Sequence, residues 1–301
     1  MLYQRSSSVV LGPARYGKAE VRIVHVSRNG AEHALKDLAV SVALSGDQAD
    51  THLTGDNAKV LTTDAQKNAV YALARQHGVA TAEEFALLLT RHFLSTCPYI
   101  GHARIAVEEY AWDRIPGAES RHSFVRGGRE VRTVLVHADA DGRSTVVSGL
   151  KDLVVLNTAG SEFHGFYKDE YTTLAETTDR VLATAVDARW RHTDSAESAP
   201  EADWDKSYAR ARAALMTAFA DTHSLSLQQT LYAMGERLLS QDDRVAEVRL
   251  VLPNRHHFAV DLAPFGLTNE NEVFYAADRP YGLIEGTLSR AGAPPDPGAW
   301  E

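Results

Sequence analysis

The 301-residue sequence contains a single cysteine, Cys97, which cannot form a disulfide within the chain. The fold therefore needs no oxidising compartment. The first ten residues have no apolar stretch of about 7 to 15 residues, which a signal peptide requires. The apolar runs Ala69–Ala74 and Phe85–Leu89 are much shorter than a membrane span, and the chain ends without a peroxisomal Ser-Lys-Leu sequence. We expect a cytoplasmic protein that does not enter a membrane.

Positive charge is also scarce. The chain has 31 Lys and Arg against 40 Asp and Glu, for a formal net charge of −9. Such a balance repels phosphate backbones and anionic lipid surfaces, so nucleic acid is excluded as a main partner. The 44% of hydrophobic residues is typical of a globular protein and excludes disorder of the whole chain.

Common cofactor and nucleophile motifs are missing. None of the 13 histidines stands in an H-x-x-x-H or H-E-x-x-H arrangement, and the adjacent His256 and His257 are expected on opposite faces of a strand. No G-x-G-x-x-G follows a predicted strand, and there is no Walker loop or G-x-S-x-G elbow. Cys97 lies outside any Cys/His motif and is interpreted as a small, partly buried thiol without a role. We expect no metal and no cofactor.

Hydrophobic periodicity describes one pattern of elements that occurs twice: two strands, two helices and two strands. In the first half the predicted elements are strands at 18–26 and 35–44, helices between Asp64 and Gly78 and between Thr81 and Pro98, and strands at about 100–112 and 123–137. In the second half they are strands near 145–156 and 180–190, a helix through 204–219, a helix after the capping box of Ser226 and Gln229, and strands at 248–252 and 281–288.

The order of these elements indicates the fold class. Strands and helices do not alternate one by one, as a parallel sheet would require, so we predict an antiparallel α+β fold. We expect two tandem units, residues 1–142 and 143–301, each an antiparallel four-stranded sheet with two helices on one face. The second unit would end in a flexible Pro/Gly tail from about residue 290. Open sheet edges in such units favour oligomerisation.

A few polar residues stand out, although each has an ordinary explanation. Lys18 lies on the polar side of its strand, where a solvated lysine is the default interpretation. Thr63 or Asp64 would by default be the N-cap of the following helix. Asn254 and His256 have the same parity and could project from one face of a strand, as polar residues of half-buried strands often do.

Several short runs that contain these residues follow one another between about Tyr16 and Leu288. They are Tyr16-Gly17-Lys18, Gly55-Asp56-Asn57, Thr63-Asp64-Ala65-Gln66-Lys67-Asn68, Gly160-Ser161-Glu162-Phe163-His164-Gly165-Phe166, Asp169-Glu170-Tyr171-Thr172-Thr173-Leu174, Thr178-Asp179-Arg180, Ser226-Leu227-Gln228 and Pro253-Asn254-Arg255-His256. In this order they resemble the urate oxidase (uricase) family over almost the whole chain.

The resemblance implies a fold and a reaction. The fold is the tunnelling fold, with two tandem units per chain and a homotetramer whose sheets close a barrel. The reaction is the cofactor-free oxidation of urate by O2 to 5-hydroxyisourate, with hydrogen peroxide as the second product.

It also implies a role for each matching residue. Arg180, Gln228 and Phe163 would hold the two edges and the face of the purine, and Leu227 would contribute a backbone N–H. Leu227 replaces a branched residue of some relatives, which matters little if only its backbone is used.

The remaining matches concern proton transfer and oxygen. Lys18, Thr63 and His256 would form a proton relay, while Asn254 and Thr63 would form a pocket for O2 and water. Asp64 would contact the purine or order Lys18. The resemblance implies that Thr63 and Asp64 reach the site from a neighbouring subunit, so that a monomer would be inactive.

Two alternatives remain. A cyclohydrolase-like or aldolase-like relative of the same fold would usually anchor its heterocycle with a glutamate or bind a metal through Cys and His, which Gln228 and the lone Cys97 disfavour. A non-catalytic purine-binding or assembly protein with the same pocket is disfavoured by the intact Lys18, Thr63 and His256. Peroxide release would exclude it.

Overall fold

The computed structural model describes residues 9–193, 203–277 and 279–301. The chain forms two compact units. Of the described residues, the first unit takes those within Met1–Arg126 and Val134–Val146 together with Trp300, and the second takes those within Gly127–Thr133 and Val147–Ala299 together with Glu301. The division expected after residue 142 remains a prediction.

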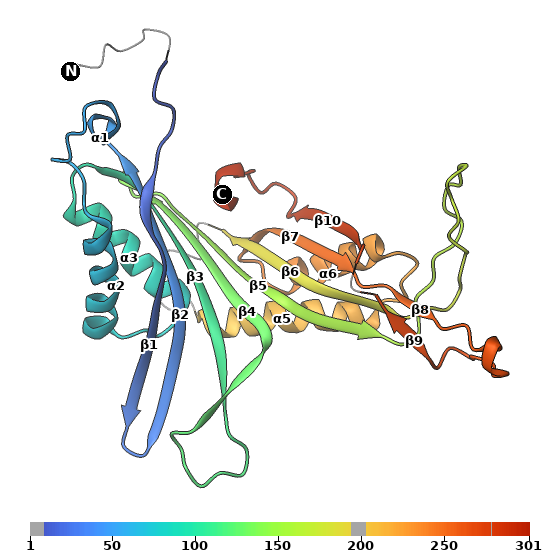
Figure 1. Cartoon of the computed structure of the whole chain (residues 1–301). Helices are drawn as coiled ribbons and strands as arrows, with labels where there is room; N and C mark the ends of the chain where they lie inside the picture. The colour runs from blue at the N-terminus through green and yellow to red at the C-terminus, as the bar shows by residue number, and fades with distance from the viewer. Residues whose placement is uncertain (1–8, 194–202, 278) are drawn as a thin grey trace. The chain divides into compact units, whose positions relative to one another are not determined.

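The strands of the first unit follow the order β1-β2-β3-β4. Its elements are β1 (Tyr16–Asn29), β2 (Glu32–Gly46), α1 (Ala49–Leu53), α2 (Thr63–His77), α3 (Ala82–Thr96), β3 (Ile100–Arg114) and β4 (Phe124–Asp139). In the antiparallel register Val21 lies opposite Val40, and Val40 opposite Val107. Because all three are buried, they mark the face of the sheet on which α2 packs beside β1 and α3 beside β3 (Figure 1).

The start of β1 departs from regular pairing. The register with β2 shifts between Lys18 and Val21. Glu20 has a φ of +54°, rare for a residue with a side chain, and its N–H donates to Ser41 Oγ at 2.9 Å. A Cβ on Gly17 would stand 1.7 Å from the carbonyl oxygen of Val42, so only glycine fits there. The strand therefore approaches β2 closely before Lys18 and bulges directly after it.

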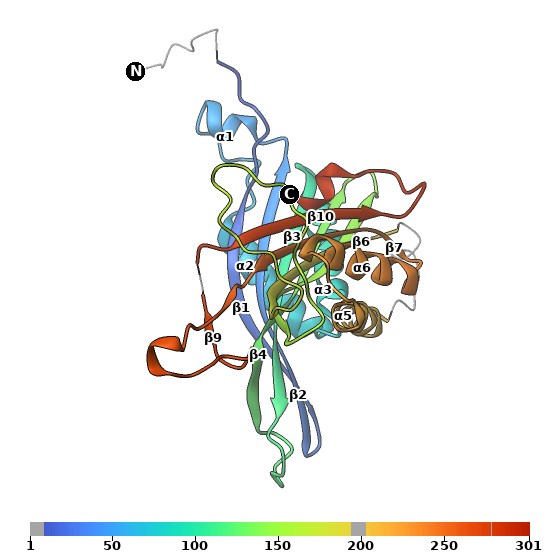
Figure 2. The same cartoon turned by 90° about the vertical axis from the view of Figure 1, so that its right-hand side faces the viewer.

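The strands of the second unit follow the order β5-β6-β7-β10, and every pair for which a register is defined is antiparallel. Its elements are β5 (Ser144–Asn157), β6 (Leu182–His192), α5 (Trp204–Asp221), α6 (Leu227–Gln241), β7 (Val245–Asn254), β8 (His257–Ala259), η1 (Ala263–Phe265), β9 (Phe274–Ala276), β10 (Gly282–Ser289) and η2 (Pro297–Trp300). The helices α5 and α6 lie side by side (Figure 2), and their buried faces meet Trp190 and Leu250 of the sheet.

The antiparallel α+β class and the predicted order of long elements are confirmed. Three short features differ from the expectation. Helix α1 and the β8–β9 hairpin were not anticipated, because segments of three to five residues carry almost no periodicity. The tail expected to be flexible contains η2, which Asp296 caps through the N–H of Ala299, and Arg191 donates to the carbonyl oxygen of Pro294 at 2.8 Å. No helix in the described part of the chain has the length and apolarity to cross a membrane.

Candidate active site

The N-terminal end of α6 presents backbone donors. Ser226 caps the helix, with its Oγ accepting from the N–H of Gln229 at 3.2 Å, and Gln229 Oε1 accepts from the N–H of Leu225 at 2.8 Å. The N–H groups of Leu227 and Gln228 have no partner among the described residues. The side chain of Leu227 is buried and that of Gln228 is exposed. This helix end, with its partial positive charge, is suited to an anion.

The loop between β5 and β6 (residues 158–181, the β5–β6 loop) lies against the segment that leads into α6. Ser161 and Ser224 form a parallel bridge and are both fully buried. The N–H of Glu162 donates to the carbonyl oxygen of Ser224 at 2.7 Å, and the N–H of Ser224 donates to that of Gly160 at 2.9 Å. These backbone bonds hold the loop beside the helix end.

Arg180 is anchored by Ser161. Its backbone N–H donates to the Ser161 carbonyl oxygen and its Nε to Ser161 Oγ, each at 3.0 Å. Burial lowers the pKa of the guanidinium, which still carries its charge at neutral pH. The two terminal nitrogens have no partner within the described residues, so a planar fork of donors is left for a ligand.

Phe163 provides an aromatic face beside this guanidinium. The Arg180 Cζ lies 5.2 Å from the centroid of the Phe163 ring, and Phe166 stacks on that ring at 5.0 Å with an interplanar angle of 16°. The backbone of Phe163 exchanges hydrogen bonds of 2.8 and 3.0 Å with Thr177. Phe163 is half-buried, so part of its ring remains accessible.

Asn254 and His256 lie where β7 ends. Asn254 is the last residue of β7, opposite Thr184 of β6 and Gly282 of β10. His256 lies between β7 and β8, so the prediction that it shares one strand with Asn254 is wrong. The His256 ring stacks on Phe258 at 5.7 Å and 23°, as their shared parity indicated. Both site residues are half-buried.

Lys18, Thr63 and Asp64 belong to the first unit. The N-cap of α2 is Thr62, whose Oγ1 accepts from the N–H of Ala65 at 3.1 Å. The default interpretation of Thr63 or Asp64 as the cap is therefore wrong. The half-buried Thr63 hydroxyl has no hydrogen-bond partner in the described part of the chain and remains available for other chemistry.

Asp64 connects these residues electrostatically. The ammonium of Lys67, 2.5 Å away, holds the pKa of the Asp64 carboxyl below its usual value, and Asn68 and Lys18 contribute smaller effects in the same direction. Lys18 stands directly before the bulge in β1 and is half-buried. Lys18 and Asp64 thus act on each other across the start of α2.

The predicted site residues fall into two sets. The second unit brings together Phe163, Arg180, Leu227 and Gln228 and also carries Asn254 and His256, whereas Lys18, Thr63 and Asp64 are in the first unit. Among the described residues no group of three or more His, Cys, Asp and Glu side chains is arranged to hold a metal ion.

The residues that support the site were not among those predicted from the sequence. Ser161 and Thr177 orient Arg180 and Phe163, and Ser224 fixes the loop beside α6. Ser161 lies within one of the quoted runs, but nothing in the sequence links it to Ser224, which is 63 residues away.

Comparisons with known proteins identify one family. The model of the family described as Uricase matches residues 14–137 and 146–285. A uricase from Arthrobacter globiformis is 50% identical over 294 residues, which are 98% of this chain and 94% of that protein. A uricase from Dictyostelium discoideum is 38% identical over 282 residues, which are 92% and 96% of the two chains.

Solved structures agree with these relatives. The crystal structure of the Arthrobacter globiformis uricase superposes with a TM-score of 0.92 at 50% identity and covers 98% of this chain and 99% of that one. A urate oxidase from Bacillus sp. TB-90 shares the fold, with a TM-score of 0.81 at 23% identity and coverage of 92% and 100%.

Proposed function

The chain belongs to the uricase family, and on that premise we propose that it is a urate oxidase. The reaction is urate plus O2 plus water to 5-hydroxyisourate plus hydrogen peroxide. Urate loses two electrons, O2 accepts them and leaves as peroxide, and the oxygen of water becomes the new hydroxyl group. We propose that this oxidoreductase uses no cofactor, because a deprotonated urate is itself a good electron donor.

The observation that carries the proposal is the position of Arg180 and Phe163 at the N-terminal end of α6. Urate is a flat anion whose edges present both donors and acceptors. The Arg180 fork suits one edge, Gln228 can donate and accept at another, and the Leu227 N–H adds a fixed donor. The Phe163 ring covers the purine face. A site that pairs polar edges in this way rejects purines that lack them.

Proton transfer falls to Lys18, Thr63 and His256. The Thr63 hydroxyl can accept one hydrogen bond and donate another, so it can pass a proton between the Lys18 amine and the ring. His256 would move a second proton at the opposite end of the relay. Asp64, whose pKa is lowered slightly by the charge on Lys18, would contact the purine or order this lysine. Asn254 and Thr63 together would hold O2 and later the attacking water.

Lys18, Thr63 and Asp64 lie in the first unit, whereas the residues proposed to contact the purine, which we call the purine set, lie in the second: Phe163, Arg180, Leu227 and Gln228. We therefore propose that a complete site forms between subunits of a homotetramer. The strands at the ends of the order support assembly: β1 pairs only with β2, and β10 only with β7, among the described strands. Such edges are normally covered. Closure of a barrel by these sheets and a cytoplasmic location belong to the same proposal. Gel filtration at about four times 32.9 kDa would support it, and an active monomer would contradict it.

The test is to follow the ultraviolet absorbance of urate and the release of peroxide together, in air, with protein freed of metal by chelation. We expect the absorbance to fall with a matching amount of peroxide. An intact tetramer that binds urate without consuming it would indicate the non-catalytic purine-binding alternative. A protein that ignores urate and converts another heterocycle would indicate the cyclohydrolase-like or aldolase-like alternative.

A further inference from the structure

One cluster of titratable side chains next to the purine set has no role in the proposed reaction. The carboxylate of Glu162 accepts two hydrogen bonds, from His223 Nε2 at 2.6 Å and from His164 Nε2 at 2.9 Å. Its side chain is only 20% exposed, compared with 60% for His223 and 48% for His164. The carboxylate is thus the most enclosed member of the cluster.

The two histidines come from different segments. His164 belongs to the β5–β6 loop, as Glu162 does, whereas His223 precedes Ser224 in the connection between α5 and α6. The bond from Glu162 to His164 is therefore internal to the loop. The bond from Glu162 to His223 joins the loop to the segment that leads into α6, across 61 residues of sequence.

The position of this link matters because each side of it carries part of the purine set. Phe163 follows Glu162 directly, and Arg180 is anchored one residue before it through Ser161. On the other side, Leu227 and Gln228 are the fourth and fifth residues after His223. The backbone bonds at Ser161 and Ser224 set the register of the two segments. The Glu162 side chain restrains the loop directly before Phe163.

The chemistry of the cluster makes the link durable near neutral pH. The hydrogen bonds from His223 and His164 lower the pKa of Glu162, so the carboxylate is ionised and can only accept. Both Nε2 atoms must then carry their protons, which a neutral imidazole permits. The link persists whether or not the histidines are charged, and protonation strengthens it.

We propose that Glu162 is a positioning residue for urate: through His223 it fixes the loop that carries Phe163 and Arg180 against the end of α6 that carries Leu227 and Gln228. This role rests on the proposed function. It predicts that loss of the link weakens urate binding more than it slows the chemical step, because the relay residues lie elsewhere in the chain.

The test compares variants of the full-length protein by the Kd of urate without O2 and by kcat and KM in air. We expect Glu162→Ala and His223→Ala to raise Kd and KM about three- to tenfold, a modest change because both histidines are exposed, while kcat changes less than about twofold. The double variant should be no weaker than either single one, because all three lose the same bond. His223→Arg, whose guanidinium can still donate to Glu162, should restore the affinity.

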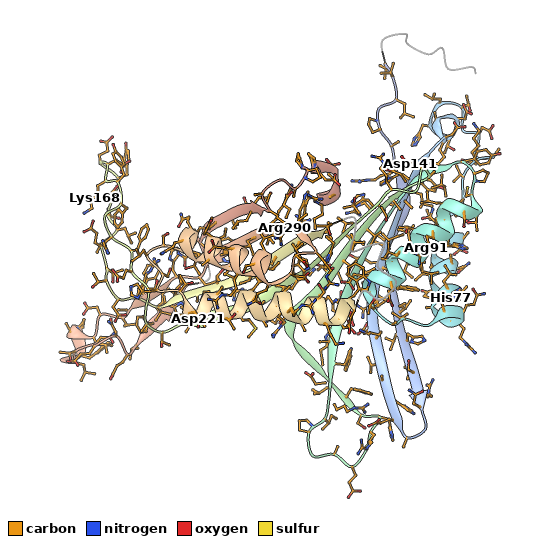
Figure 3. The ribbon with its side chains drawn as sticks, turned by 180° about the vertical axis from the view of Figure 1, so that it is seen from behind. His77, Arg91, Asp141, Lys168, Asp221 and Arg290 are labelled. Atoms are coloured by element: carbon orange, nitrogen blue, oxygen red, sulfur yellow. The ribbon has the colours of Figure 1, made fainter. Side chains whose placement is uncertain are left out.

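Two variants serve as matched controls. Glu176 is a second carboxylate of the same loop. It accepts from the N–H of Gly165 and from Lys168, which lies on the outer part of the loop (Figure 3), and within the described residues it has no bond to the segment that leads into α6. Glu176→Gln and His164→Gln should leave Kd within about twofold of the wild type.

The outcomes separate the two proposals. If the wild type releases peroxide from urate but Glu162→Ala and His223→Ala keep its Kd, the positioning role is wrong and the proposed function stands. The role is also wrong if Glu176→Gln weakens binding as much as His223→Ala. If the wild type neither binds nor oxidises urate, both proposals fail. Thermal unfolding of every variant distinguishes a lost link from a lost fold.

Discussion

The two units contain the same β-bulge at equivalent positions, but the side chains beside it differ. In the first unit the register shifts between Lys18 and Val21, and in the second between Leu150 and Leu153. Each shift contains one residue in the left-handed region, Glu20 or Asp152, whose N–H donates to a side chain of the next strand. The residue before the bulge differs in character: Lys18 is half-buried and polar, and Leu150 is a 1% exposed core residue.

At the N-terminal ends of the equivalent helices α3 and α6, the polar site residue belongs to the second unit instead of the first. Thr81 caps α3 as Ser226 caps α6, each through the N–H three residues later. The second residue of α3 is Glu83, which is fully buried, and the second residue of α6 is the exposed Gln228. In the first unit this helix end serves the interior, and in the second it is open to a ligand.

A third pair of equivalent positions, Glu109 in β3 and Asn254 in β7, shows the same difference as the two helix ends. Glu109 lies opposite Leu38 in the first unit and bonds to Lys36, whereas Asn254 lies opposite Thr184 in the second. The site residues proposed for the first unit lie in β1 and α2, and those proposed for the second lie in the β5–β6 loop, in α6 and at the end of β7. Under the proposed function, the two copies of one scaffold divide the site between them, and neither copy holds all of it.

Replacing the residue before the bulge should have the largest effect and should differ most between the two units. We expect Lys18→Met to lower kcat by about 10²- to 10⁴-fold, because the relay loses its amine, while gel filtration shows the same assembly as the wild type. The counterpart, Leu150→Met, changes only packing and should leave kcat unchanged at a loss of less than about 1.5 kcal/mol of unfolding free energy. Normal turnover in Lys18→Met would show that Lys18 does not take part in proton transfer.

Acid should lower the free energy of unfolding through a residue of the second unit, His192, that has no titratable counterpart in the first. His192 of β6 occupies the place that Gly46 has in β2, at the register shift near the strand end. Burial lowers the pKa of His192 from 6.5 to about 4. Above pH 6.5 the ring is neutral in the native and unfolded chains. As pH falls toward 4, only the unfolded chain gains the proton, so about 3 kcal/mol of stability is lost.

Chemical denaturation of the wild type and of His192→Gln at several pH values measures this loss. Glutamine can still bond to Ser148 Oγ, the partner of His192 Nε2 at 3.0 Å. We expect the difference in unfolding free energy between the two proteins to change across pH 6.5 to 4 and to be constant above it. Parallel pH profiles would show that His192 is not the group responsible.

Exchange of the purine-binding cation should have a smaller effect. Lysine cannot reproduce the two-pronged contact of Arg180, so we expect Arg180→Lys to raise the KM of urate about tenfold or more. The control is Arg237→Lys in α6, where the arginine pairs with Asp221 at the end of α5 (Figure 3), and there KM should not change. An unchanged KM in Arg180→Lys would refute the contact.

The smallest effect is expected from glycine at the left-handed position of each bulge, and it should be the same in both units. Glycine adopts the left-handed region without a steric penalty, so Glu20→Gly and Asp152→Gly should each raise the free energy of unfolding by up to about 1 kcal/mol. Thermal melting would detect this, with kcat unaffected. Loss of stability in only one variant would show that its side chain, and not the bulge, is what that unit requires.

The long elements could be predicted because their burial is periodic. Buried residues alternate at Val21 and Ile23 in β1 and from Val40 to Leu44 in β2, and they recur at helical spacing in α2 and α3. The same order of elements in both halves of the chain supports each assignment. The bulges could not be predicted, since a single Glu20 or Asp152 within a run of strand residues does not by itself indicate a positive φ. The cap of α2 was misplaced because Thr62, Thr63 and Asp64 can all cap a helix.

The candidate site was predictable only in part. The resemblance to a family named Arg180, Gln228 and Lys18, and the structure shows how the local chain presents each of them. The contacts that support the site, such as Glu162 with His223, join residues that are far apart in sequence and leave no local pattern. Their identification required the fold.

The division of the site between units is tested most directly by mixing two inactive proteins. Lys18→Met has a defective first unit, and Arg180→Gln has a defective second unit. If each site combines the first unit of one subunit with the second unit of its neighbour, random reassembly should restore about a quarter of the wild-type peroxide release from urate. If the mixture stays as inactive as its two components, the site is not shared between chains.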